Sequence, residues 1–359
     1  MPRRAVVAGF AAVLLASIGA PAYAAGQDSG APTSGFTQIN QVSDQAGKAN
    51  LTDGDLVNSW GLALSATSPL WSANNGTNTA TLYSGGLGGA SVGKVGLTVS
   101  IDGGAPTGQV FNGTSDFVVK NSDNVGGPAR FIFDSEGGDV AAWNPAAHPT
   151  TAVVMAHVDG AVFKGLALAQ TASGNFLLAA DFHNGRVDIF DSSFNLSPLT
   201  GSRFNDPTIP DGYSPFNVVV NGDSVIVTYA KLSAGGLDEV DGPGLGLVDE
   251  YTNFGQTVHR IATHGTLNAP WGVAIAPPGF GQIAGSLLIG NFGDGRINVF
   301  TNGEFAGQLR DTNNRKITID GLWALLPGTA STGGVGTIWF SSGPNDESDG
   351  LLGQLVSGS

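Results

Sequence analysis

The sequence predicts an all-β protein, a six-bladed β-propeller of four-stranded antiparallel blades that an N-terminal strand closes into a ring. Three observations predict it: a hairpin motif that occurs twice, a strand start that recurs at regular spacing, and an unusual composition. The 359 residues include 55 glycines and only 12% charged residues, which is typical of many tight turns and few exposed helices. The chain has no cysteine, which excludes disulfides and thiolate metal sites.

The repeated hairpin has the same turn chemistry in both copies. Residues 176–190 and 287–300 each place β-rich runs on both sides of an Asn-Gly or Asp-Gly pair. Such a pair favours a type I′ turn, because both central residues need a positive φ that Gly adopts freely and that Asn or Asp tolerates. A long hairpin repeated in this way predicts a β-blade as the structural unit.

A glycine followed by short apolar residues opens most of the predicted units. This landmark occurs at Gly61, Gly165, Gly272 and Gly321, with Asn217 in its place in one unit. The intervals from position 165 onward are 52, 55 and 49 residues, whereas Gly61 precedes Gly165 by 104. The long interval predicts a further unit that begins near residues 112–113. Six units at this spacing match the period of propeller repeats, for which kelch repeats of roughly fifty residues are the nearest standard.

Each unit is expected to add an outer strand beyond its hairpin, as in residues 93–101, 151–158 and 257–262. One blade cannot bury both of its faces, so neighbouring blades must stack and the ring must close. The strand 36–42 has no hairpin of its own, and we expect it to complete the last blade and cover its open edge. The β-propeller would then span residues 36–357.

The first 35 residues carry no repeat. A basic start at Arg3 and Arg4, an apolar run over 5–19 and a small-x-small site at 22–24 predict a signal peptide over residues 1–24. A retained N-terminal anchor is the alternative. Residues 25–35 are small and polar and are predicted to be a disordered lead. The mature chain is therefore expected to be exported, periplasmic or extracellular, monomeric and without membrane insertion.

Removal of the signal peptide leaves 13 basic against 29 acidic residues, a formal charge of −16. This charge repels nucleic acid and anionic lipid, so neither is expected as a partner. It favours solubility, a cationic partner or bound divalent cations, and solubility alone is a sufficient reason for it.

Several motifs together resemble a known family of exported bacterial proteins, first noticed in bacteria that use PEP-CTERM protein sorting. The motifs are residues 60–63, 180–190, 213–217, 268–274, 290–298 and 342–353. The resemblance spans about residues 38–355 and implies a propeller similar to NHL-repeat and gluconolactonase-like proteins, without an assigned activity. The chain lacks the C-terminal Pro-Glu-Pro signal of sorted proteins, so we do not expect sorting by that route.

The likeness to gluconolactonases implies that a divalent cation in the channel should be considered. In those enzymes a Glu and several Asn or Asp side chains hold the cation, and two of these side chains belong to residues that directly precede the glycine opening an innermost strand. Here the corresponding residues are Trp60, Lys164, Trp271 and Asp320, with Asn112 in the weak unit. A cation would be opposed by Lys164, so the gluconolactonase metal site is not expected. The tryptophans, together with Trp323, are expected to fill the wedges between blades.

A different set of polar residues falls at the same point of four predicted hairpins. These candidate ligand-binding residues are Asn74, Asp134, Asp181 and Asn291, with Asp294 in a following turn. Propellers bind ligands where such loops converge. Turn chemistry is the alternative explanation, because Asx side chains bond nearby backbone amides at strand ends. The candidate general base is His183, the only histidine inside a strongly patterned motif, because histidine is a residue type suited to this role near neutral pH, but no nucleophile accompanies it.

Two acidic loops complete the candidates. In the loop 345–350, Asp346, Glu347 and Asp349 are candidate ligands of Ca²⁺, the one cofactor that the sequence suggests. A solvated turn explains this loop more simply, because the bidentate Glu of an EF-hand is missing. The acidic insertion 237–246 lengthens one hairpin, and long propeller loops contact ligands or cap the channel. A mobile loop without a ligand is the alternative.

These observations predict a non-catalytic binding or interaction module for an extracellular or envelope ligand that the sequence does not identify. The reason is that no nucleophile, base and metal set converge in the sequence. The alternative is a divalent-cation-dependent hydrolase or lactonase-like enzyme that uses Asp181, His183 and Asn291 at the channel mouth. A structural role in the envelope or extracellular matrix is a third alternative.

Overall fold

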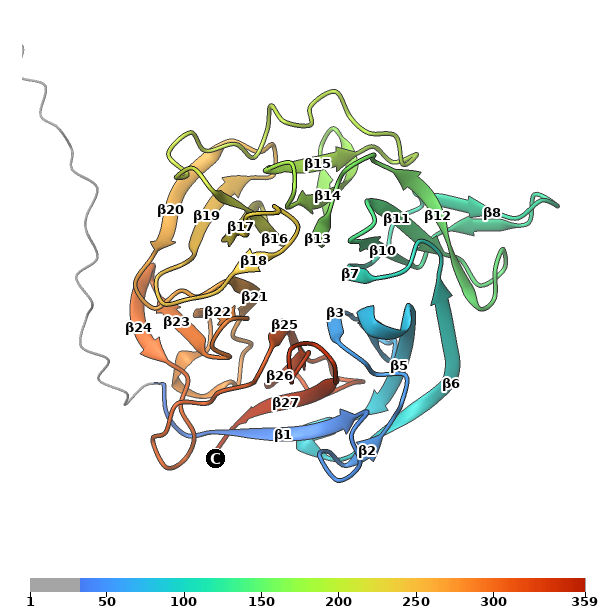
Figure 1. Ribbon diagram of the computed structural model, residues 1–359. Coiled ribbons are helices and arrows are strands. Elements are labelled where there is room, and N and C mark those ends of the chain that lie inside the picture. The colour runs from blue at the N-terminus through green and yellow to red at the C-terminus, as the bar shows by residue number, and fades with distance from the viewer. Residues whose placement is uncertain (1–32, 359) are drawn as a thin grey trace, which may run out of the picture.

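The computed structural model describes residues 33–358, which form 27 strands and three short 3-10 turns. The strands build sheets that stand radially around a central axis, as Figure 1 shows. This arrangement confirms the predicted all-β propeller. The predicted signal peptide lies outside the described residues. Of the predicted lead, residues 33–35 are described, and the backbone of Thr33 and Gly35 is hydrogen-bonded to Arg310 and Asp311.

Hydrogen bonding groups these strands into five sheets around the axis, four of which have four or more strands. The largest has the order β3 (Ser59–Ala63), β4 (Leu70–Asn74), β5 (Thr79–Gly85), β6 (Val92–Ile101), β12 (Thr151–His157), β11 (Asp139–Trp143), β10 (Phe131–Ser135), β7 (Pro106–Phe111). Its two halves are joined only by a short parallel pairing between β6 and β12. The predicted hairpin at 130–143 and the outer strands at 93–101 and 151–158 are therefore confirmed.

The next three sheets follow in chain order around the ring. The first contains β13 (Phe163–Thr171), β14 (Gly174–Asp181) and β15 (Arg186–Phe190). The second contains β16 (Tyr213–Asn221), β17 (Ser224–Leu232), β19 (Leu247–Thr252) and β20 (Thr257–Thr263), with β18 (Glu239–Val240) paired to β17. The third contains β21 (Pro270–Ile275), β22 (Leu287–Asn291), β23 (Ile297–Thr301) and β24 (Glu304–Gln308). Both copies of the repeated hairpin are confirmed as β14–β15 and β22–β23.

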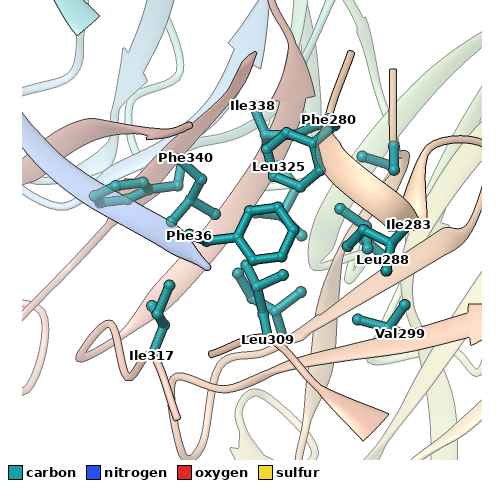
Figure 2. Packing of buried hydrophobic residues seen from close by; sticks show 14 of the residues in the cluster. Phe36, Phe280, Ile283, Leu288, Val299, Leu309, Ile317, Leu325, Ile338 and Phe340 are labelled. Atoms are coloured by element: carbon teal, nitrogen blue, oxygen red, sulfur yellow. The ribbon is translucent and has the colours of Figure 1, made fainter. Parts of the chain in front are cut away.

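The last sheet joins the two ends of the chain. Its order is β2 (Leu51–Thr52), β1 (Phe36–Ser43), β27 (Leu351–Ser357), β26 (Thr337–Ser342), β25 (Leu322–Pro327). The antiparallel pairing of β1 with β27 confirms that the N-terminal strand closes the ring. Figure 2 shows Phe36 of β1 packed among side chains of this sheet and the preceding one, including Phe280 at 4.8 Å between ring centroids.

One hairpin lies apart from these sheets. It pairs β8 (Val118–Lys120) with β9 (Gly126–Pro128) in the connection between β7 and β10, and it projects from the ring (Figure 1). The sequence analysis did not predict it. Within residues 33–358, no helix has both the length and the apolar character that a membrane crossing requires.

The turns of the repeated hairpins differ from the predicted type I′. Only Gly185 and Gly295 have positive φ, at 67° and 66°, and Asn184 and Asp294 do not. In the first copy, four residues separate the paired Asp181 and Arg186, so the loop is longer than a two-residue turn. The Asp181 carboxylate stabilises this loop by accepting hydrogen bonds from the backbone and side chain of Asn184.

The landmark glycines mark places where two innermost strands touch, and this finding corrects two of the predicted positions. At Gly108 of β7, an added Cβ would collide with the backbone of Leu166 on β13. Gly108, and not the predicted Gly113, is therefore the landmark of the second unit. In the last unit the equivalent position is Ala324, because the register shift of β25 falls between Leu322 and Leu325. The predicted Gly321 instead approaches the Gly343 backbone.

Candidate functional site

The strands nearest the axis each contribute one side chain at a matching position. They are β3, β7, β13, β16, β21 and β25, and consecutive members of this cycle contact one another around the axis (Figure 1). Each of these strands shifts its register against its hairpin partner near its start. The residues in these shifts are Trp60, Thr107, Lys164, Phe216, Trp271 and Trp323.

Four of these residues form an aromatic plug, which we define as Trp60, Phe216, Trp271 and Trp323. Trp60 stacks on Trp323 with 3.7 Å between ring centroids, and Trp271 meets Trp323 edge-on at 5.8 Å. Phe216 contacts Trp323 at 6.0 Å. The prediction that the tryptophans pack between sheets is correct, but their predicted place in separate wedges is wrong. They come from three sheets and meet in one cluster, because the register shift places the same position of each innermost strand toward the axis.

Lys164 is the charged member of this set and lies in a polar cluster over the plug. Its side chain is 3% exposed, and its Nζ lies 2.7 Å from Glu136 Oε1 and 3.3 Å from Asp238 Oδ1. The same Nζ lies 5.2 Å from the centre of the Trp60 ring, a cation–π contact. Burial lowers the pKa of Lys164, but the neighbouring carboxylates outweigh it and the pKa lies above its ordinary value. The ammonium is therefore held charged.

Two further carboxyl groups belong to this cluster. Burial raises the pKa of Glu239 to about 7, against the lowering effect of the Lys164 charge. Glu239 is half-buried overall, but its Oε2 is sealed from solvent and has no hydrogen-bond partner within residues 33–358. Burial also raises the pKa of Glu347, whose Oε2 accepts a 2.7 Å hydrogen bond from Asn58. We call Glu136, Asp238, Glu239 and Glu347 around Lys164 the acidic mouth.

Two asparagines connect the acidic mouth to the plug. The Asn58 side chain accepts a hydrogen bond from Trp323 Nε1 at 2.9 Å while it donates to Glu347. Asn75 donates to Glu136 Oε2 at 3.0 Å. Glu136 and Glu347 are thus fixed by direct hydrogen bonds to neighbouring loops, an arrangement that favours a positive charge beside them.

The predicted polar residues at the strand ends form hydrogen bonds with neighbouring residues. Asn74, Asp134, Asp181 and Asn291 are at most 1% exposed. Asn74 donates to Thr79 and Thr81, and Asn291 donates to the Thr266 carbonyl and to Asp294. The structure does not bring these four side chains together at the mouth. Turn and strand-end bonding, the alternative of the sequence analysis, accounts for these contacts.

Asp134 differs from the other three residues because one of its carboxyl oxygens has no hydrogen-bond partner among residues 33–358. Its Oδ1 accepts hydrogen bonds from the Gly108 amide at 2.6 Å and from Thr107 at 2.9 Å, but its buried Oδ2 has no partner among residues 33–358. Burial raises its pKa to about 7. The Asp134 side chain is 1% exposed, so it contacts the landmark residue Gly108 and is shielded from solvent.

The candidate base and the candidate metal ligands also have local partners. His183 is exposed, and its Nδ1 lies 2.9 Å from the carbonyl of Gly236, the residue just before the acidic insertion. Asp349 accepts hydrogen bonds from Gln45 and Asn345, whereas Glu347 turns to Asn58 in the acidic mouth, and Asp346 is exposed. Within residues 33–358, no group of three or more His, Asp or Glu side chains has a geometry that could hold a metal ion.

A cavity of about 560 Å³ lies along the axis, lined by residues from all six innermost strands. Of the plug residues, Trp271 belongs to its lining, whereas Trp60, Phe216 and Trp323 do not. The cavity is therefore bounded toward the acidic mouth by the aromatic plug. No charged side chain contributes to its wall among the described residues.

Comparison with known proteins shows close relatives in a virus. Protein R648 of Acanthamoeba polyphaga mimivirus, itself uncharacterised, is 33% identical over 324 residues, which cover 88% of this chain and 78% of R648. The chain belongs to the R648 family. A second member, the mimivirus protein L690, is 32% identical over 314 residues, which cover 85% of this chain and 81% of L690. No family model matches the chain.

The solved structures similar to this R648 family member support the fold only. A protein of unknown function from Bacteroides thetaiotaomicron has a TM-score of 0.52 at 11% identity, over 89% of this chain and 76% of its own. A streptogramin B lyase gives a TM-score of 0.47 at 12% identity. Both of these R648 family members are viral proteins, and none of the comparisons supports the expected link to bacteria with PEP-CTERM sorting.

Proposed function

We propose that this protein is a non-catalytic binding module whose ligand site is the acidic mouth. The observation that carries the proposal is the gathering of Glu136, Asp238, Glu239 and Glu347 around one buried ammonium. These carboxyl groups come from loops of three different sheets, so only the folded ring assembles them. Loops that converge at the end of a propeller channel are the usual place for a ligand.

The chemistry of the mouth favours a cationic ligand. Four carboxyl groups face a single lysine, so the mouth has acceptors in excess of its own positive charge. Trp60 beneath them is 1% exposed, and its ring already contacts the Lys164 ammonium, so it helps to stabilise that internal cation. Lys164 already occupies part of the site as an internal cation, and a ligand amine or guanidinium would pair with the carboxylates that it leaves exposed, Asp238 above all.

The proposal includes the finer architecture and the location of the protein. We infer that the ring comprises six blades, because six innermost strands with matching register shifts support that count. In this division the largest sheet contains two blades and the sheet of β13 to β15 is a blade of three strands. We also propose that the protein is exported, on the strength of the signal-like residues 1–24, and that it acts as a monomer.

A titration with spermidine, a trivalent amine, tests the cationic site by calorimetry. The variant Asp238→Asn/Glu347→Gln should bind roughly tenfold more weakly, as expected for the loss of two partly exposed ion pairs. The matched control Asp123→Asn/Glu304→Gln removes the same charges at exposed positions far from the loops of the mouth. If both variants weaken binding equally, only the net charge of the protein attracts the amine. Absence of saturable binding would also refute the proposal.

One observation favours a second candidate function, proton transfer at the same mouth. A carboxyl group with a pKa of about 7 is suited to act as an acid or a base near neutral pH, and Glu239 has that pKa beside Lys164. This candidate replaces the set of Asp181, His183 and Asn291 by a single residue. It predicts turnover of an ester or lactone panel that Glu239→Gln abolishes without a change in melting temperature.

A further inference from the structure

The axial cavity offers a second and chemically different environment from the acidic mouth. Its wall alternates aliphatic side chains with the edges of the innermost strands. Each of these strands is hydrogen-bonded to a neighbour on one side only, so its other edge is directed toward the axis. The cavity therefore combines apolar surface with strand edges that have no neighbouring strand of their own sheet on the axial side. Its volume of about 560 Å³ is in the range of small-molecule sites, roughly 300–1,000 Å³.

One side chain of the lining has polar atoms without a partner. Gln109 of β7 is 6% exposed, and both its Nε2 and its Oε1 are buried with no hydrogen-bond partner within residues 33–358. Such an amide has lost its water contacts without replacement, and this state costs free energy unless a partner is supplied. Gln170, in contrast, lines the cavity where it is exposed.

The lining also sets the charge of any occupant. It contains no Asp, Glu, Lys, Arg or His among the described residues, so an ion inside would have no counter-charge. Burial of an uncompensated charge is strongly unfavourable. The aromatic plug lies between the cavity and the carboxyl groups of the mouth, so those groups do not supply the missing charge.

We propose that the axial cavity is a second ligand site, which takes a small uncharged molecule with an aliphatic body and an amide-like edge. The aliphatic body packs against residues such as Leu168, Val220 and Leu326. The donor and acceptor of the edge pair with the Nε2 and Oε1 of Gln109 after that side chain turns from its buried position toward the cavity. Primary carboxamides and lactams present such an edge.

The test uses cyclohexanecarboxamide as the probe and cyclohexanecarboxylate as its charged counterpart, with the full chain and saturation-transfer NMR titrations. We expect saturable binding of the carboxamide and none of the carboxylate at neutral pH. Val220→Trp, which fills the cavity, should abolish binding, while Val258→Trp, the same change at an exposed position of β20, should not. Melting curves establish that both variants are folded.

A matched pair of variants tests the role of Gln109. Gln109→Leu should weaken carboxamide binding at least roughly tenfold, as expected for the loss of two hydrogen bonds, and Gln170→Leu should leave it unchanged. No saturable binding, equal binding of the carboxylate, or undiminished binding to Val220→Trp would overturn the proposed site. Equal affinity of Gln109→Leu and wild type would overturn the assigned amide contact. None of these results depends on whether spermidine binds at the mouth.

Discussion

Replacement of Lys164 by methionine is the most direct perturbation of the acidic mouth. The change keeps an unbranched side chain over Trp60 but removes the ammonium that lies 2.7 Å from Glu136 and 3.3 Å from Asp238. Removing one partner of a fully buried ion pair costs about 3–5 kcal/mol. Here the partner side chains are 30% and 74% exposed, so solvent can recover part of that cost. We therefore expect a loss of about 2 kcal/mol in the free energy of unfolding at pH 8.

The pH dependence of this loss identifies its cause. The folded-state pKa of Glu239 is raised from 4.5 to about 7, so its contribution to stability is complete below the unfolded pKa and declines as the pH rises through 7. The Lys164 charge opposes this rise and the similar one at Glu347. Without it both pKa values increase further. The cost of Lys164→Met should therefore be larger at pH 8 than at pH 5, where Glu239 is largely protonated.

Urea unfolding followed by circular dichroism at the two pH values measures both effects. Lys231→Met, at an exposed lysine of β17, is the matched control and should change the free energy of unfolding by less than about 0.5 kcal/mol. A cost for Lys164→Met that is equal at pH 5 and pH 8 would refute the electrostatic reasoning, because lost packing alone does not titrate. A cost no larger than that of the control would refute the coupling of Lys164 to the mouth.

Three further predictions address the buried groups and the metal. Because burial raises the pKa of Asp134 from 3.8 to about 7, Asp134→Asn should flatten the decline of melting temperature between about pH 4 and pH 7, and an unchanged slope would contradict this. Phe36→Ala, at a 2% exposed residue of the closing strand, should cost about 3–5 kcal/mol in urea unfolding, whereas Phe254→Ala, at a 52% exposed residue, should cost little. The melting temperature should be the same in calcium and in EDTA, because Glu347 and Asp349 already have hydrogen-bond partners, and a large drop in EDTA would show a metal site.

The sequence was informative where a local pattern decides the structure. The two hairpins, the outer strands and the closing strand follow from period-two alternation, turn residues and spacing, and each was predicted within a few residues. The glycine landmarks were less reliable. Only a contact between two strands identifies Gly108 and not Gly113, since neither glycine is followed directly by the apolar residues that mark the other landmarks, and the sequence does not contain that contact. The same reason shifted the last landmark from Ala324 to Gly321.

The acidic mouth could not be predicted because its members are far apart in sequence. Lys164, Glu136, Asp238 and Glu347 meet only when the ring closes, and no single sequence motif contains more than one of these four residues. The sequence analysis took Lys164 as evidence against a cation site, and it took Glu347 as one ligand of such a site. The available signal was indirect: the acidic insertion 237–246, predicted to contact a ligand or cap the channel, does carry Asp238 and Glu239 to the mouth.

A single repeated position explains why the two proposed sites differ in chemistry. The register shift of each innermost strand directs one residue to the axis, and three of the six are tryptophans that close the channel. Thr107 is the smallest of the six and belongs to β7, the strand between those of Lys164 and Trp60. Because its side chain is short, Lys164 can reach over the Trp60 ring, and a large residue at 107 would block that contact. The identity of the residues in this ring therefore places the one ammonium of the mouth among the carboxyl groups of the loops and isolates the uncharged cavity from it.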